Sequence, residues 1–371
     1  MMSFSLTRRS LLRTSGLAFG AGIFSSAAYG RLPESVPQDT IHLNLNENAF
    51  GPSPSVAMAI QNEFSRISRY ADTASAQALS EQVAAYERVP VEQIVLGEIL
   101  GALGLYLGSR GGPGGEFIYS TPGYLALVDA ASHVGGVGAP VPLNREYRND
   151  LPALSARINK RTRAIYLINP HNPTGTLNDD KPFKQFLREV SQQAPVIVDE
   201  AYLEYTPDFE KRSAVSLVRD GVNVLVFRTF DKIHGLAGLP IGYSIVPRDI
   251  GEVLRKEGFG DAEGLGRFNI AAASAALADT GHVQEVRKSI AAERVHWNSV
   301  LDELKLQRTD AQGDFVFFDT GKPHEVIATG FKKAGIEIGR TFPPYSTWAR
   351  ITIGLPQENK RAQEQLRRLV G

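Results

Sequence analysis

The sequence predicts an α/β protein in which a large domain, built on a mostly parallel central sheet, precedes a smaller α+β domain. Between residues 71 and 270, short apolar segments alternate with segments of helical periodicity, which is typical of a parallel sheet covered on both faces. After about Asn269 this alternation is replaced by a long helical region and two further strands. A chain of 371 residues is long enough to bury the core of one large or two medium-sized domains.

The composition is that of an ordinary globular chain. The 40 basic residues balance 40 acidic ones, which argues against a protein that coats nucleic acid or binds membranes through a basic surface. Hydrophobic residues make up 43% and charged residues 22%, far from the composition of a disordered chain. The absence of cysteine excludes disulfides and thiol nucleophiles. The seven histidines show no spacing typical of metal ligands, so we expect no metal site.

Residues 1–30 predict export. They contain three arginines and no acidic residue, and the stretch 7–12 with Arg8 and Arg9 resembles the twin-arginine export signal. The modest apolar run that follows, residues 17–28, ends in small residues suited to a signal peptidase and is too short to span a membrane. We therefore expect a periplasmic or otherwise exported protein, and a cytoplasmic one with a basic N-terminus is the alternative. Removal of the segment would leave 37 basic residues against 40 acidic ones.

The predicted elements of the large domain follow one another along the chain. An extended arm runs from Asp39 to Phe50 and ends in a glycine- and proline-rich turn. Apolar residues at helical spacing predict helices over residues 56–67, 75–86, 98–107 and 125–133. Short apolar runs predict strands at residues 94–96, 116–119, 164–168, 196–198 and 222–227.

The C-terminal part of the chain predicts the smaller domain. Residues 271–304 have helical periodicity with a break near Gly281, and strands are expected at residues 315–318 and 349–353. The predicted segments are a signal peptide (1–30), an N-terminal arm that joins the small domain (31–70), the large domain (71–270) and the small C-terminal domain (271–371).

Polar side chains follow the last three predicted strands of the large domain. Asn172 follows the first of these strands, Asp199 and Tyr202 follow the second, and Lys232 follows the third. Ligands of parallel sheets bind beyond the carboxyl ends of the strands. A partly desolvated lysine there can lose its proton and form a Schiff base, and a carboxylate can keep a pyridine nitrogen protonated. An amide and a phenol can both reach a ring oxygen, so these residue types predict a pyridoxal phosphate site.

The chain resembles the fold-type I pyridoxal-phosphate enzymes, and within them the histidinol-phosphate aminotransferase-like group. The resemblance extends from about Asn44 to Leu369 and depends on the order of eight short motifs, each of which is weak alone. The motifs are Asn44–Asn48 with Gly51–Pro54, Arg69–Tyr70, Pro122–Tyr124, Asn172–Gly175, Asp199–Tyr202, Thr229–Lys232, Gly335–Arg340 and Arg350–Gly354.

The resemblance implies a role for each cofactor-binding residue. Lys232 would hold pyridoxal 5'-phosphate as a Schiff base and move a proton at the substrate, with Asp199 on the pyridine nitrogen. Asn172 and Tyr202 would bond the ring hydroxyl, and Tyr124 would stack on the ring. On this basis Lys232, Asp199 and Tyr202 are the predicted catalytic residues.

Other residues are implied to bind the substrate or the partner subunit. Arg350 would take the substrate carboxylate, a bidentate contact suited to a guanidinium. Asn46 and Asn48 lie on the arm that helps close over the substrate. Tyr70 would reach the cofactor phosphate of a partner subunit, which implies a homodimer.

The sequence departs from the family where it should bind the cofactor phosphate. The turn there is Glu98-Ile99-Leu100, and Thr229 keeps a hydroxyl group. Asp231 occupies the position of the family's serine, and Pro240 that of its arginine. Two carboxylates would repel a phosphate dianion. Three interpretations stay open: Arg228, Arg69 or a partner residue compensates, the cofactor binds weakly, or the protein has left transamination.

The predicted function is a pyridoxal-phosphate-dependent aminotransferase that passes an amino group from an amino acid to a 2-oxo acid. The alternatives are another fold-type I enzyme, such as a lyase or cyclase, and a degenerate family member with weak cofactor binding. We expect no nucleic-acid partner and no membrane association after the signal is removed. Tyr345, Phe342 and Arg340 are candidates for the specificity pocket, with Arg340 meeting an acidic substrate group.

Overall fold

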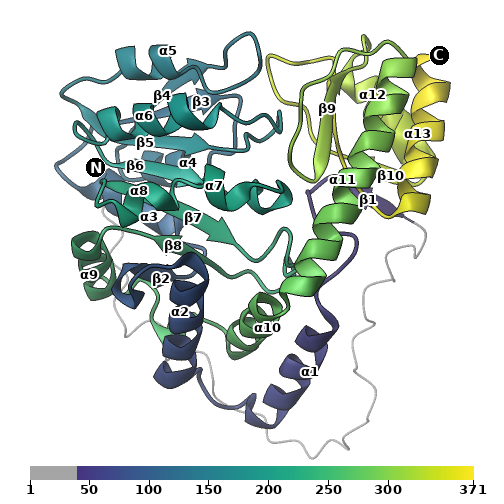
Figure 1. Ribbon diagram of the computed structural model, residues 1–371. Coiled ribbons are helices and arrows are strands. Elements are labelled where there is room, and N and C mark those ends of the chain that lie inside the picture. The colour runs from purple at the N-terminus through teal and green to yellow at the C-terminus, as the bar shows by residue number, and fades with distance from the viewer. Residues whose placement is uncertain (1–39) are drawn as a thin grey trace, which may run out of the picture. The chain divides into compact units, whose positions relative to one another are not determined.

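A seven-stranded sheet is the largest element of the computed structural model, which describes residues 40–371 (Figure 1). The predicted signal peptide, residues 1–30, lies outside the described residues. In spatial order the strands are β2 (Ile94–Leu96), β8 (Gly242–Ile245), β7 (Val224–Thr229), β6 (Val196–Asp199), β5 (Thr162–Ile168), β3 (Glu116–Thr121) and β4 (Val137–Pro142).

The sheet is mostly parallel, as predicted. Strand β8 runs antiparallel to both of its neighbours, β2 and β7, and every other neighbouring pair is parallel. The sequence interpretation missed β8 and β4. Strand β4 contains two prolines and a glycine, which are tolerated there because it lies at the edge of the sheet. Strand β8 begins with Gly242 and contains Ser244, so it lacks a continuous apolar run.

The two faces of the sheet bury separate hydrophobic cores. Val196 and Val198 of β6 point into one core, together with side chains of α2, α6, α8 and α10. Ile197 points to the opposite face and packs with side chains of α3, α4 and α9. Successive side chains of a strand alternate between faces, so a strand buried on both faces must be apolar at every position. This requirement explains the continuous Val-Ile-Val run.

Thirteen α-helices surround and extend these sheets in the described part of the chain. They are α1 (Pro54–Glu63), α2 (Thr73–Glu87), α3 (Leu100–Ser109), α4 (Ala126–Ser132), α5 (Leu151–Ala156), α6 (Asp180–Val190), α7 (Phe209–Arg212), α8 (Val215–Arg219), α9 (Arg248–Lys256), α10 (Arg267–Ala278), α11 (Thr280–Glu303), α12 (His324–Lys333) and α13 (Pro356–Val370). Short 3₁₀ turns are η1 (Phe64–Arg66), η2 (Val91–Gln93), η3 (Leu203–Tyr205) and η4 (Ala262–Gly264).

The break in the long helical region lies at Asp279, two residues before the predicted position. The side chain of Asp279 accepts a hydrogen bond from the backbone N–H of His282 at 3.0 Å and so caps the start of α11. A capping carboxylate satisfies an N–H group that has no partner within the helix, so the new helix starts here and not at Gly281.

Two small sheets lie beyond α11 (Figure 1). Strand β9 (Phe315–Asp319) pairs antiparallel with β11 (Trp348–Thr352), and α11 packs against β9 and α13. In the N-terminal arm, β1 (Ile41–Leu43) pairs in parallel with β10 (Ile336–Ile338). This pairing brings the arm to the C-terminal part of the chain. The domain boundaries proposed from the sequence stay a prediction.

None of the helices between residues 40 and 371 combines the length and the apolar character needed to cross a membrane.

Candidate active site

A cavity of about 560 Å³ opens where the strands β5, β6 and β7 end. This is the edge at which ligands bind parallel sheets, and the volume is typical of small-molecule sites. The arm, α3, the segment from β3 into α4, β10 with the segment after it, and β11 supply other parts of the wall. Ten of the thirteen residues predicted for the site line it: Asn46, Glu98, Leu100, Tyr124, Asn172, Asp199, Tyr202, Thr229, Lys232 and Arg350.

The structure places the other three predicted residues elsewhere. The side chain of Ile99 is buried in the core beside α3 and α4. Asn48, on the arm, is buried, and its amide donates a hydrogen bond to the backbone oxygen of Ile233 at 2.9 Å. Tyr70 is 83% exposed on the surface. Within one chain, therefore, these three side chains do not reach the cavity.

Strand β7 extends two residues further than predicted, because Arg228 and Thr229 pair with Tyr243 and Gly242 of β8. The prediction that this strand ends at Phe227 is therefore wrong. Alternation along the strand then sends the two polar side chains to opposite faces. Thr229 lines the cavity, whereas Arg228 points into the protein behind it.

Asp199 is the last residue of β6 and is 3% exposed. Its Oδ2 accepts a hydrogen bond from the Tyr166 hydroxyl at 2.9 Å, and its Oδ1 accepts one from the Ala201 backbone at 3.0 Å. Burial raises the pKa of Asp199 to about 6, and these hydrogen bonds and the charge of Lys232 offset only part of that rise. A cation that faced Asp199 across the cavity would restore its charged form.

A chain of hydrogen bonds connects Tyr202 to Arg350. The Tyr202 hydroxyl accepts hydrogen bonds from the amides of Asn46 at 3.0 Å and Asn172 at 3.3 Å. The Oδ1 atom of Asn172 accepts a bond from Arg350 at 2.7 Å, and the backbone oxygen of Asn44 accepts another at 2.7 Å. These contacts hold the guanidinium of Arg350 in one orientation at the cavity wall. Its Nε has no hydrogen-bond partner among the described residues.

The amine of Lys232 lies 5.9 Å from the centre of the Tyr202 ring and donates a long hydrogen bond of 3.5 Å to the backbone oxygen of Leu45. Burial lowers the pKa of this amine, but Tyr202, Asp314 and Asp231 outweigh that effect and the net shift is upward. The direction is opposite to what desolvation alone predicts. The free amine is therefore held protonated and must lose a proton before it can attack a carbonyl carbon.

Asp314 is a residue of this region that the sequence interpretation missed. It is fully buried just before β9, where its Oδ2 accepts a hydrogen bond from the Tyr205 hydroxyl at 3.1 Å. Its Oδ1 has no hydrogen-bond partner in the described chain. Burial raises its pKa to about 6, and the charges of Lys232 and Arg350 lower it in part. A single acidic residue before a strand is a common turn residue, so the sequence carries only a weak signal for this position.

Two carboxylates, Glu98 and Asp231, lie at another part of the cavity wall, beside the start of α3. The Thr229 hydroxyl donates a hydrogen bond to Glu98 Oε1 at 2.7 Å and accepts one from the Asp231 backbone at 3.1 Å. Burial and then the charge of Asp231 raise the pKa of Glu98 to about 7. Gly242 makes room for this carboxylate, because a Cβ there would lie 2.6 Å from Glu98 Oε1.

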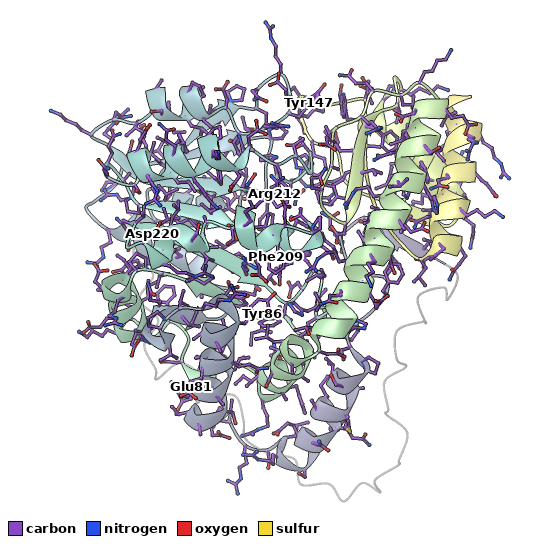
Figure 2. All side chains as sticks on the ribbon, viewed as in Figure 1. Glu81, Tyr86, Tyr147, Phe209, Arg212 and Asp220 are labelled. Atoms are coloured by element: carbon purple, nitrogen blue, oxygen red, sulfur yellow. The ribbon has the colours of Figure 1, made fainter. Side chains whose placement is uncertain are left out.

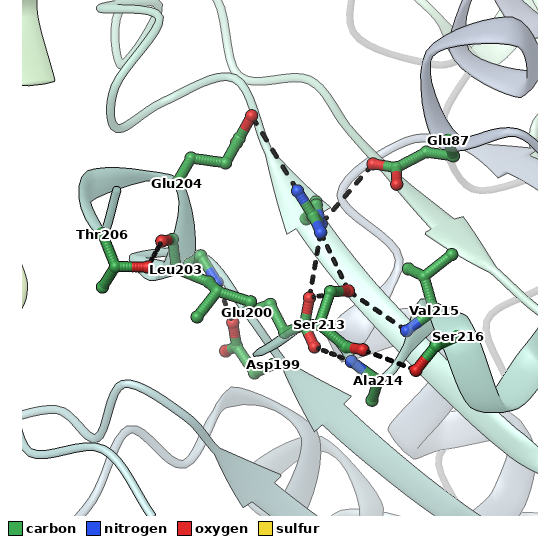
Figure 3. A network of polar contacts seen from close by, with 12 residues as sticks. Glu87, Asp199, Glu200, Leu203, Glu204, Thr206, Ser213, Ala214, Val215 and Ser216 are labelled. Atoms are coloured by element: carbon green, nitrogen blue, oxygen red, sulfur yellow. Dashed lines mark hydrogen bonds and ion pairs between the residues drawn. The ribbon is translucent and has the colours of Figure 1, made fainter. Parts of the chain in front are cut away.

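Behind the cavity, the buried guanidinium of Arg228 lies among three buried carboxylates. Figure 3 shows Glu87, Glu200 and Glu204 around it. The nearest nitrogen–oxygen distances are 3.1 Å to Glu200, 3.5 Å to Glu87 and 3.9 Å to Glu204. The guanidinium of Arg228 therefore pairs with these buried carboxylates and not with a group in the cavity. The interpretation that Arg228 compensates for missing phosphate contacts is wrong.

The same network supports the segment that carries Lys232. Burial alone would raise the pKa of Glu204, but His234, two residues after Lys232, Arg228 and the Tyr86 hydroxyl lower it to about 2. Tyr86 and Phe209 approach this region from different elements (Figure 2), and the Arg228 guanidinium carbon lies 5.6 Å from the centre of the Phe209 ring. A buried charge cluster with this many partners fixes its neighbours in place.

Known proteins identify the family of the chain. The family described as aminotransferase class I and II matches residues 38–366. The chain belongs to this family. The predicted resemblance is thus confirmed, and the protein is a pyridoxal-phosphate-dependent aminotransferase, an enzyme class whose substrates are amino acids and 2-oxo acids.

Curated relatives of this aminotransferase cover most of its length. It is 33% identical to the histidinol-phosphate aminotransferase of Moorella thermoacetica over 90% of this chain and 86% of that relative. It is 34% identical to the aromatic amino acid aminotransferase of Thermobifida fusca over 85% of this chain and 87% of the relative. The histidinol-phosphate aminotransferase of Sinorhizobium meliloti, solved with pyridoxal 5'-phosphate, superposes with a TM-score of 0.81 at 26% identity, covering 93% of this chain and 99% of that one. The predicted fold type is confirmed.

The polar groups of the aminotransferase fit the ring of the cofactor. Bound pyridoxal phosphate supplies an aldehyde that bonds amines and a ring that withdraws electrons from them. Lys232 offers an amine for the aldehyde, buried Asp199 an oxygen for the ring nitrogen, and Tyr202 a phenol for the ring hydroxyl. The carboxylates of Glu98 and Asp231 are the part of the wall that suits a phosphate group least.

Proposed function

We propose that the amine of Lys232 in this aminotransferase would hold the cofactor at its aldehyde carbon, with loss of water, and, once the substrate amine has replaced it there, would move a proton at the α-carbon of the substrate. One observation supports this proposal above the others: Lys232, Asp199 and Arg350 lie on the wall of one cavity, although they are far apart in the sequence. Their separate positions at the ends of β6 and β7 and within β11 give each group a fixed backbone.

The remaining polar groups position the ring. The carboxylate of Asp199 holds the ring nitrogen protonated, and binding a cation there lowers its pKa from the raised value of about 6. Asn172 and Tyr202 bond the ring oxygen from the other side, where they already share a hydrogen bond of 3.3 Å. Tyr124 covers the ring from the mouth of the cavity, since its side chain lines the wall and is 49% exposed.

Arg350 binds the α-carboxylate of the substrate. It is held at the cavity wall by Asn172 and by the backbone of Asn44, and it forms no ion pair within the described residues. A guanidinium held by uncharged groups keeps its full charge for an incoming carboxylate. The predicted role of Asn46 is indirect, because its amide orients Tyr202.

A second guanidinium indicates the class of substrate. Arg340 and Arg350 both line the cavity, and their guanidinium carbons lie 4.4 and 5.0 Å from the centre of the Phe342 ring. Arg340 is exposed, and its guanidinium donates a hydrogen bond only to the backbone of Thr341 in the described chain. We infer that one of the two substrates is a dicarboxylic amino acid, whose side-chain carboxylate binds Arg340.

Trapping of the lysine tests the catalytic proposal. Borohydride reduction of the cofactor-loaded enzyme, followed by peptide mass mapping, should place the cofactor on Lys232. The Lys232→Ala variant should remain folded and unlabelled. Label on a different lysine would contradict the assignment.

A panel of amino acids tests the substrate class. Each amino acid is incubated with the loaded enzyme, and the 2-oxo acid is measured by mass spectrometry. Glutamate or aspartate should react faster than neutral aliphatic amino acids. Failure of both glutamate and aspartate to react, while aromatic amino acids or histidinol phosphate, the substrates in the names of its relatives, are converted, would overturn the dicarboxylic proposal but not the role of Lys232.

We also propose a homodimer that buries the surface around α1 and η1. Large apolar side chains are exposed there and on the following segment: Met58, Phe64, Ile67 and Tyr70. A patch of this kind favours a protein–protein contact, and Tyr70 would enter the partner's cavity.

Two experiments test the homodimer. Light scattering should give the mass of two chains for wild type and the mass of one chain for Met58→Glu. Mixing Tyr70→Phe with Lys232→Ala subunits should restore part of the activity that each variant lacks, since one cavity of the mixed dimer is intact.

Finally, we propose export by the twin-arginine route, supported by Arg8 and Arg9 in the N-terminal sequence. A fusion of residues 1–38 to a reporter that works only after export should be active, and replacement of both arginines by lysine should abolish export. Export of the lysine variant would indicate a different route.

A further inference from the structure

The proposed contacts of the ring determine where the phosphate arm of the cofactor lies. On a pyridoxal ring, the hydroxyl group and the phosphate arm flank the aldehyde carbon on opposite sides. If the aldehyde faces Lys232 and the hydroxyl faces Tyr202, the arm must lie on the side of Lys232 away from Tyr202. Glu98, Thr229 and Asp231 are polar residues of the cavity wall that are linked by hydrogen bonds to one another and not to Tyr202, so we assign the arm to them.

These groups offer an anion few hydrogen-bond donors. A threonine hydroxyl has one proton, and that of Thr229 is donated to Glu98 Oε1 at 2.7 Å. Leu100 and Gly101, the first two residues of α3, line the cavity, and the start of a helix favours an anion. The carboxylates of Glu98 and Asp231 act against it. Binding of a phosphate group therefore depends on the charge state of these carboxylates.

We propose that Glu98 is protonated when the cofactor phosphate is bound, so that its carboxyl group donates a hydrogen bond to the phosphate and cofactor binding takes up a proton. The inference rests on the proposed attachment at Lys232. The geometry supports it, because Glu98 lines the cavity and has one oxygen bonded to Thr229, which leaves the other oxygen to take a proton.

The surroundings of Glu98 favour the protonated form. Asp231, on the segment after β7, and Asp199, at the end of β6, both raise its pKa by their negative charge. The hydrogen bond from Thr229 and the charge of Lys232 lower it, and Tyr124 is an uncharged residue of the same cavity wall. The net result is the raised pKa of about 7. Glu98 lines the cavity and is exposed in the cofactor-free protein, so a bound phosphate would remove water from it and add further negative charge.

Asp231 is less suited to hold this proton. Burial raises the pKa of Asp231 overall, and the positive charge of Lys232, its neighbour in the chain, offsets part of that rise. No other cation is a cause of the Asp231 shift, and Lys232 acts less strongly on Glu98 than Asp231 does. In its charged form, Asp231 therefore makes protonation of Glu98 easier.

Comparison of two aldehydes tests the proposal. Pyridoxal lacks the phosphate group but has the same ring and aldehyde as pyridoxal phosphate. The dissociation constants of both are measured between pH 6.5 and 9 by absorbance titration of the full-length enzyme, and their ratio gives the contribution of the phosphate. The aldehydes themselves titrate in solution, which also changes this ratio with pH. Dividing the wild-type ratio by the ratio for Glu98→Gln at the same pH cancels that change.

The wild-type preference for the phosphate should fall by up to about tenfold per pH unit above pH 7, because only the protonated fraction is competent. The Glu98→Gln variant, which keeps a donor at all pH values, should show no such fall. In the Asp231→Asn variant, the preference for the phosphate should begin to fall at a lower pH, because loss of the neighbouring negative charge lowers the pKa of Glu98. Calorimetry in two buffers of different ionisation enthalpy should show that wild type takes up about one proton more than Glu98→Gln at pH 8, since the protons exchanged at Asp199, Lys232 and the ring are common to both proteins.

The possible failures are distinguishable. Equal pH dependence in wild type and Glu98→Gln, with both aldehydes bonded to Lys232, would overturn this inference alone. Failure of both aldehydes to label Lys232 would overturn the inference together with the proposed function.

Discussion

Replacement of Asp314 by asparagine should stabilise the cofactor-free protein at neutral pH. Asp314 is fully buried, and burial raises its pKa from 3.8 to about 6 despite the hydrogen bond from Tyr205. A raised carboxyl pKa means that the folded state binds a proton more tightly than the unfolded state. The charged form is therefore a cost to folding at neutral pH, and asparagine removes that charge at nearly constant volume.

The size of the effect follows from the shift in pKa. A rise from 3.8 to about 6 is roughly two pH units, and each unit corresponds to about 1.4 kcal/mol. The contribution of protonated Asp314 to the free energy of unfolding is fully present below pH 4. Wild type loses this contribution, about 3 kcal/mol, as the pH rises through 6. Asparagine should therefore add about 3 kcal/mol to the free energy of unfolding at pH 7.5, reduced by about 1 kcal/mol if its bond with Tyr205 is poorer. At pH 4 the two proteins should be nearly equal.

Urea unfolding at pH 4, 5.5 and 7.5 measures this difference directly. Asp310→Asn, at an exposed position four residues earlier, is the matched control and should show no comparable gain at pH 7.5. If Asp314→Asn is no more stable than wild type at pH 7.5, or gains the same amount at pH 4, then the buried carboxylate is not the source of a pH-dependent cost and the reasoning fails.

Three further substitutions test the cavity and the network behind it. Arg350→Lys should raise KM for amino acids about tenfold to a hundredfold with a smaller change in kcat, because a single ammonium replaces a bidentate contact; an unchanged KM would remove Arg350 from substrate binding. Arg340→Gln should raise KM for dicarboxylic but not for aromatic amino acids in steady-state assays, and an equal rise for both would show that Arg340 is not selective. Arg228→Met should lower the free energy of unfolding by about 3–5 kcal/mol at pH 7.5, since it leaves three buried carboxylates without their cation. A loss equal to that of Arg145→Met, at an exposed position, would argue that the cluster contributes little.

The parts of the fold that could be predicted from the sequence are those with an unbroken local signal. The run Val196-Ile197-Val198 is apolar at every position, and only a strand buried on both faces needs that. Its end at Asp199 predicted the edge of the sheet and, with Lys232, the place of the cavity. Strand β4 could not be found this way, because its prolines and glycine are typical of loops and only its position at the edge of the sheet permits them.

The electrostatics of the site could not be read from the sequence, because they depend on which side chains meet across the fold. Desolvation alone predicts a lowered pKa for Lys232, yet Asp314, 82 positions later in the sequence, helps to raise it. Arg228 directly precedes Thr229, but side chains alternate along β7, so the two side chains lie on opposite faces of the sheet. The pairing of β7 with β8 extends the strand to Thr229 and so determines which residues near Lys232 face the cavity and which face the core. The sequence did not predict this pairing.

The pairing of β7 with β8 also limits how many residues can be inserted or deleted near Lys232. The segment of Lys232 leaves the sheet at Thr229 and re-enters it at Gly242, and the Phe230 backbone N–H donates to the Ile241 oxygen at 2.9 Å just inside this turn. Because both ends are tied to adjacent strands, an inserted or deleted residue here would displace the amine itself. Relatives of this enzyme should accordingly tolerate changes of length in the surface connections of the chain but keep the number of residues between Thr229 and Gly242 nearly constant.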